Sequence, residues 1–118
     1  MDFDRLTVAL LILRPDAPRL DDAAAAALQD AHLSHLANLH ESGALVAAGP
    51  LMGDGDHIYR GLSIFTVGAD EARRLAESDP AVQAGRYRIE VLPWMVPGGA
   101  MRFAPARFPR SVAEATGG

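Results

Sequence analysis

The chain has 118 residues, of which 49% are hydrophobic and 22% charged, and this length suits one globular domain with a core of its own. It contains neither cysteine nor lysine, which excludes disulfides, thiol catalysis, cysteine-bound metals, Schiff bases and the lysine-dependent phosphate loop. The net charge is -4, which argues against nucleic acid as a partner. No apolar run approaches the roughly 20 residues of a membrane span, which argues against a membrane. We therefore expect a cytoplasmic protein.

The first half of the chain predicts a strand, a long helix and a second strand. Residues 6–13 form a continuous apolar run, which is typical of a strand with both faces covered. Residues 22–43 have the strongest helical pattern, and either Asp21 or Asp22 is placed to cap the N-terminus of that helix. Residues 44–48 form a short second strand that ends at a Gly-Pro pair.

The second half predicts a strand, a short helix and a last strand. Residues 61–67 are apolar, residues 70–78 begin with acids that suit a helix N-terminus, and residues 87–94 alternate as a strand does. Asp79 precedes a proline, which predicts one more helical turn. The order is β-α-β-β-α-β, so we predict an α+β domain of the ferredoxin-like kind over residues 1–96.

Residues 97–118 form a predicted C-terminal extension. They hold three arginines and one glutamate, whereas residues 1–96 hold eight arginines and fourteen acids. Prolines keep the extension irregular, but its two phenylalanines are too apolar for a pure linker. We expect residues 100–108 to be ordered against their own or a partner subunit, with the mouth of a pocket as one location, and residues 113–118 to be loose.

Two histidines lie on the apolar face of the predicted long helix. On a helical wheel His32 and His35 fall in the same stripe as Leu28, Leu36 and Leu39. A single histidine in such a stripe is most often a satisfied core residue, but two of them one turn apart favour a pocket. Burial favours the neutral imidazole, which is the form that a general base needs.

A metal site is not expected from these residues. His40 lies roughly 80° around the helix from His32, and the HExxH spacing of metalloproteases is absent. The loop at residues 53–57 lacks the further acids of a calcium loop, so it is interpreted as a hairpin loop. No cofactor is expected.

Asp79 and Ser63 are the other polar candidates. Asp79 is expected to cap a helical turn, and a carboxylate held by backbone N–H groups stays ionised and can also orient an imidazole. Ser63 would be a nucleophile only beside a base, and no G-x-S-x-G motif occurs. Ser63 is therefore interpreted as an ordinary strand residue that can line a site.

Several motifs, taken in order, resemble the YCII-related (YciI-like) family over roughly residues 5–94. They are His32-Leu33-x-x-Leu36, Gly43-x-Leu45-Val46-x-Ala48-Gly49-Pro50-Leu51, Gly61-Leu62-x-Ile64-Phe65, Asp79-Pro80-Ala81-Val82-x-Ala84-Gly85 and Val91-x-Pro93-Trp94. The second and fourth of these motifs in combination are the most specific part.

The resemblance implies a ferredoxin-like domain that pairs with a second copy into a dimeric α/β barrel, an architecture that muconolactone isomerase shares. It also implies a catalytic pair, a histidine of the first helix and the aspartate of the Asp-Pro motif, which fall on His32 and Asp79. The best-described enzyme of this kind is a dehydrochlorinase of a chlorinated hydroxyhydroquinone. The other residues that we expect at a substrate are His35, Leu36, Pro50, Ser63 and Trp94.

We therefore expect a cofactor-independent enzyme with His32 as general base or acid and Asp79 as its orienting group, in an elimination, isomerisation or cyclisation. The substrate would be a cyclic, polarised small molecule such as a phenol, quinone, lactone or polyketide-like intermediate. The alternative is a noncatalytic accessory dimer that binds a small ligand in the same cavity. An apolar pocket with His32 more than about 6 Å from Asp79 and no route for water would favour that alternative.

A homodimer is expected for either function. Two helices can cover only one face of a four-stranded sheet. The second face is expected to carry Leu62 and Ile64, or else their alternates Phe65 and Val67. Packing one sheet against another buries such a face.

Overall fold

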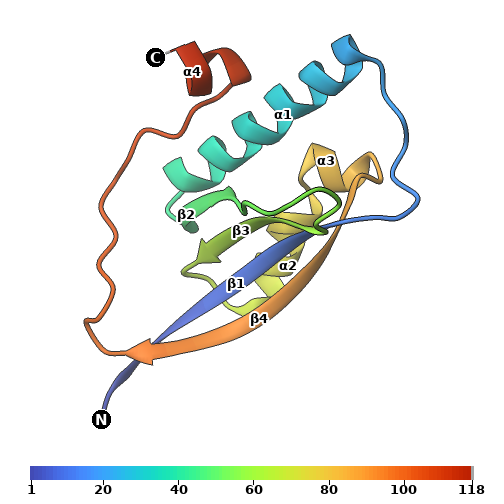
Figure 1. Cartoon of the computed structure of the whole chain (residues 1–118). Coiled ribbons are helices and arrows are strands. Elements are labelled where there is room, and N and C mark those ends of the chain that lie inside the picture. The colour runs from blue at the N-terminus through green and yellow to red at the C-terminus, as the bar shows by residue number, and fades with distance from the viewer. Residues whose placement is uncertain (118) are drawn as a thin grey trace.

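The protein has an α+β architecture in the computed structural model, which describes residues 1–117 (Figure 1). The elements in chain order are β1 (Phe3–Leu13), α1 (Asp22–Glu41), β2 (Leu45–Pro50), β3 (Tyr59–Phe65), α2 (Ala69–Glu77), α3 (Pro80–Gln83), β4 (Tyr87–Pro97) and α4 (Val112–Gly117). The predicted β-α-β-β-α-β order is confirmed, with α3 as the extra turn that begins after Asp79.

The four strands form one antiparallel sheet in the order β2-β3-β1-β4. β1 lies inside this sheet, where β3 pairs with one edge and β4 pairs with the other along the whole strand. Both edges of β1 are therefore paired, but the helices cover only one of its faces. Val8 and Leu10 point to the other face, so the expectation of a strand covered on both faces is not met within one subunit.

Both long helices cover the same face of the sheet. The core on that face joins Ala9 of β1 and Phe65 of β3 to Leu39 of α1 and Ala72 of α2, all of them buried. Side chains alternate between the two faces of a strand, so every second residue of β1 and β3 points at the helices. This face therefore holds the core.

No helix of the described chain covers the opposite face of the sheet (Figure 1). This face carries large apolar side chains. Leu62 and Ile64 pair with β1 residues of this face, whereas Phe65 belongs to the helix-covered core. Leu92 and Trp94 of β4 lie on the same open face and are 44% and 38% exposed. The first of the two residue sets predicted for the second face is therefore the observed one.

α1 is the longest helix, and its N-cap is Asp21. The Asp21 carboxylate accepts a hydrogen bond from the Ala24 N–H at 2.8 Å, while Asp22 is the first helical residue. This observation decides between the two predicted caps.

Across residues 1–117, no helix combines the length and the apolar character that crossing a membrane requires.

The C-terminal extension is more ordered than the sequence predicts. β4 continues to Pro97 instead of ending at residue 94, because its last residues pair with the start of β1. The expectation that residues 113–118 are loose is wrong for residues 113–117, which belong to α4; residue 118 lies outside the described residues. α4 is fixed by a contact distant in sequence, since Asp30 accepts a hydrogen bond from the Val112 N–H at 2.8 Å.

Candidate active site

His32 and Asp79 form a buried, hydrogen-bonded pair between α1 and the start of α3. His32 Nδ1 lies 2.6 Å from Asp79 Oδ2, and the two residues are 8% and 2% exposed. An ionised carboxylate only accepts hydrogen bonds, so His32 Nδ1 carries the hydrogen and donates it. The lone pair of the imidazole is then on Nε2, the ring nitrogen away from Asp79.

Asp79 is held in place by the helix that it caps. Its Oδ1 accepts a hydrogen bond from the Ala81 N–H at 2.8 Å, and Pro80 occupies the first position of α3. One oxygen therefore caps α3 while the other meets His32, so capping and orientation occur together as the sequence allowed. The backbone contact fixes the position of the carboxylate and, through it, the plane of the imidazole.

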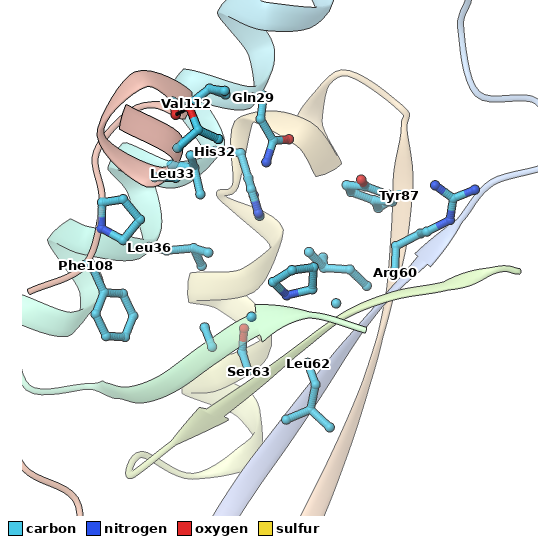
Figure 2. Close-up of a pocket in the computed structure, with 18 of the residues that line it drawn as sticks. Gln29, His32, Leu33, Leu36, Arg60, Leu62, Ser63, Tyr87, Phe108 and Val112 are labelled. Carbon is cyan, nitrogen blue, oxygen red and sulfur yellow. Dashed lines mark hydrogen bonds between the residues drawn. The ribbon is translucent and has the colours of Figure 1, made fainter. Parts of the chain in front are cut away.

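A pocket of about 610 Å³ lies beside His32 (Figure 2). This volume is within the range of small-molecule sites. The His32 ring extends from α1 into the pocket, which the sheet closes from below (Figure 2). Its walls come from α1, the end of β2, β3 and the C-terminal extension. The site thus places a histidine with a free ring nitrogen in a largely apolar cavity.

Three of the predicted substrate-binding residues line this pocket. Leu36 follows His32 by one turn of α1, Pro50 ends β2, and Ser63 lies on the floor in β3. The Ser63 hydroxyl points up toward the cavity (Figure 2). Asp79 itself lies behind His32 and does not line the pocket, which is where an orienting group belongs.

The structure corrects the expectations for His35 and Trp94. His35 turns toward α2, where its Nε2 lies 3.0 Å from the Leu75 carbonyl oxygen, and it does not line the pocket. Trp94 pairs with Leu6 on the open face of the sheet, opposite the helices. Three residues along a helix rotate the direction of the side chain by about 300°, which turns His35 away from the face that carries His32. Adjacent residues of a strand face opposite sides of the sheet, and Trp94 lies on the side away from the pocket.

Several pocket residues were missed from the sequence. Gln29 precedes His32 by three residues and projects from the same helical face, so the helical wheel contained its signal. Arg60 and Tyr87 stand near the starts of β3 and β4 and become neighbours only through the sheet. Phe108 joins from the extension, whose docking was expected but whose partner residues were not.

Metal-ligand clusters are not seen among residues 1–117: no three histidine, aspartate or glutamate side chains converge there. His40, the third histidine of α1, is engaged elsewhere. Its Nδ1 lies 2.7 Å from the Leu45 carbonyl oxygen, and its Nε2 accepts a hydrogen bond from the Ala106 N–H at 3.1 Å. The candidate chemistry of the site therefore depends on the His32 and Asp79 pair.

The sequence matches the model of the YCII-related domain over residues 8–95. The chain belongs to the YCII family. Against curated proteins, the sequence has no match.

Two solved structures are similar to this YCII chain. One is 5-chloro-2-hydroxyhydroquinone dehydrochlorinase from Burkholderia phenoliruptrix in complex with 2,5-dihydroxybenzoquinone, with 26% identity over 75% of this chain and 92% of that chain and a TM-score of 0.53. The other is a dimeric protein of unknown function with a ferredoxin-like fold from Bacteroides fragilis, with 17% identity over 78% of this chain and 95% of that chain and a TM-score of 0.46.

Proposed function

We propose that this YCII protein is a cofactor-independent enzyme that moves protons on a cyclic small molecule, with His32 as the general base or acid and Asp79 as its orienting group. The observation that carries the proposal is the 2.6 Å contact between His32 Nδ1 and Asp79 Oδ2. It leaves the Nε2 lone pair available to a bound molecule. A base oriented by a third group is a recurring catalytic unit.

The proposed step begins with proton transfer from the substrate to His32 Nε2. The electron pair of the broken O–H or C–H bond moves into the ring system, where it forms a new double bond. In an elimination, a leaving group on the ring departs with the electron pair of its bond, and the proton on Nε2 is released to water. In an isomerisation, the proton returns from Nε2 to a different atom of the substrate. Asp79 stabilises the imidazolium that exists between the two steps. A base of this kind contributes about 10²–10⁴-fold.

The charge of the pocket supports a substrate that becomes an anion. Arg60 lines the pocket, and no carboxylate does among the described residues, although the protein as a whole carries a charge of -4. Arg107 lines it as well, but its exposed guanidinium is paired with Glu114. A phenolate or enolate formed by loss of a proton would therefore meet no like charge there. Phenols and hydroxyquinones fit this condition, and the similar dehydrochlorinase is in complex with a dihydroxybenzoquinone.

We also propose that the protein acts as a homodimer joined through the open face of its sheet. Leu92 and Trp94 would otherwise leave apolar area in water, and sheet-on-sheet packing removes it. A noncatalytic dimer that binds a ligand in the same pocket is the second candidate function. The fixed Nε2 of His32 favours the enzyme over this candidate, because ligand binding alone needs no oriented base.

Proton exchange in heavy water tests the enzyme proposal without knowledge of the final product. The protein is incubated with hydroxyquinones, including 2,5-dihydroxybenzoquinone, and with 5-chloro-2-hydroxyhydroquinone, while nuclear magnetic resonance follows deuterium entering ring positions and a chloride electrode follows elimination. We expect acceleration by the intact protein and none by His32→Ala. Tight binding of these compounds with neither exchange nor elimination would favour the noncatalytic candidate.

A further inference from the structure

We propose that the C-terminal extension is a fixed wall of the pocket, latched to α1 by Arg110 and Phe108, and that it determines which ligands fit beside His32. The proposal deepens the function proposed above, since it concerns the same pocket. The extension lies beyond the shared domain, because the family match ends at residue 95. The wall is therefore an addition of this chain to the YCII domain.

The first attachment of the extension is to His40. The rings of His40 and Phe108 stack with their centroids 4.0 Å apart and their planes 8° from parallel. His40 Nδ1 donates to the Leu45 carbonyl oxygen, and its Nε2 accepts from the Ala106 N–H. One neutral tautomer satisfies both hydrogen bonds. Phe108 also packs against the buried core, so the extension is held by ring stacking and by burial.

The second attachment uses the polar face of α1, the face turned away from the core. The Arg110 guanidinium donates to Asn38 Oδ1 at 2.8 Å and pairs with Glu41 Oε1 at 2.8 Å. Asp30, two turns earlier on the helix, accepts the Val112 N–H. A polar helical face is usually solvated, but here four of its side chains bind the extension, since Ser34 Oγ also accepts from Arg110 Nη1 at 3.4 Å. The planar fork of arginine suits such a two-pronged contact.

The segment between and after these attachments faces the pocket. Phe108 and Val112 line the cavity on the side of Leu33 and Leu36 (Figure 2). Ala115 of α4 lines it as well. The wall is thus mostly apolar, and a ligand that places an apolar edge on it would keep its polar groups near His32. The extension would then select by size and shape, while the His32 pair supplies the chemistry.

Chemical labelling of the histidines tests the wall without any turnover. Diethyl pyrocarbonate modifies accessible neutral imidazoles, and peptide mass spectrometry gives a separate rate for each histidine. His32 reports entry into the pocket, His40 reports release of the extension, and His35 reports the integrity of the fold, because its Nε2 contacts the Leu75 carbonyl oxygen. In Arg110→Ala we expect His40 and His32 to react about fivefold faster or more, because losing a latch raises the open population.

Matched variants separate the latch from a general change of charge. Arg102 is an exposed arginine of the same extension, and Arg102→Ala should leave all three rates as they are. Arg110→Lys, which keeps the charge and loses the fork, should give an intermediate rate. The double variant Arg110→Ala with Phe108→Ala removes the side-chain part of both attachments and leaves the backbone bonds of Ala106 and Val112, and it should give the fastest labelling of His32.

Each other pattern would overturn the proposal. Faster labelling of His40 with an unchanged rate at His32 would mean that the extension moves but does not wall the pocket. Unchanged rates in the double variant would mean that these residues are not a latch. A rise at His35 equal to that at His32 would reduce the effect to general loosening of the fold. None of these results bears on whether His32 transfers protons, which the exchange experiment measures separately.

Discussion

His32 and His35 lie three residues apart on one helix, and their hydrogen bonds assign them different tasks. His32 hydrogen-bonds to the Asp79 carboxylate and lines the pocket, whereas His35 hydrogen-bonds to the Leu75 carbonyl oxygen of α2. We expect His32→Ala to lower turnover about 10²-fold or more in a protein that still folds, with a lower melting temperature because the buried Asp79 carboxylate loses a partner. His35→Ala should lower the free energy of unfolding by about 1 kcal/mol through its lost contact and leave the chemical step intact. Loss of turnover in His35→Ala alone would show that the wrong histidine has been assigned.

The two oxygens of Asp79 allow its structural and chemical tasks to be separated. Asn is as good an N-cap as Asp, so Asp79→Asn should keep the free energy of unfolding near that of the wild type. A neutral amide cannot stabilise an imidazolium as a carboxylate does, and turnover should fall about 10²-fold or more. Asp79→Ala should show both losses, with about 0.5–2 kcal/mol from the missing cap. Denaturant unfolding and kinetics on the same preparations check the split; equal turnover in Asp79→Asn and wild type would contradict it.

At the scale of elements, the cap of α1 offers a test of a choice that the sequence left open. Asp21 accepts the Ala24 N–H, while Asp22 is already helical. Asp21→Ala should therefore lower the free energy of unfolding by about 1 kcal/mol. Asp22→Ala, a change of the same charge one residue away, should have a smaller effect, since only the interaction of Asp22 with the helix dipole is lost. Urea denaturation measures both, and a reversed order would contradict the assigned cap.

The elements that local patterns specify were predicted correctly, and those that depend on distant partners were not. The apolar run of β1 and the amphipathic stripe of α1 are local signals, and they also brought His32 to the correct face. The prediction that Trp94 lines the substrate site was wrong, because a shift of one residue along a strand moves a side chain to the opposite face of the sheet. α4 was not predicted because the residues that hold it, Asp30 and Asn38 of α1, are 82 and 72 residues away in sequence from their partners.

At the scale of the whole molecule, the open face of the sheet determines the expected assembly. Many of its side chains are apolar, and Leu92 is 44% exposed on it, although Glu90 and Arg88 of β4 lie on the same face. Leu20 provides a matched control, since it is 40% exposed in the loop before α1, away from the sheet. A charge placed on a buried sheet-to-sheet interface is costly, whereas the same charge on a solvated loop is not. Leu92→Glu should therefore give a monomeric mass by light scattering, and Leu20→Glu should keep the dimer.

Trp94 allows the same assembly to be followed without mutation, because it is the single tryptophan of the chain and lies on the open face, 38% exposed in one subunit. Association would remove its indole from water, and dilution would return it. We expect the fluorescence maximum to move to longer wavelength as the protein is diluted from micromolar to nanomolar concentration, and to stand at the long-wavelength position in Leu92→Glu at every concentration. The dilution midpoint would then equal the dissociation constant of the dimer. A spectrum that is constant on dilution, together with a monomeric mass at micromolar concentration, would contradict the sheet-to-sheet dimer and leave the open face exposed to water.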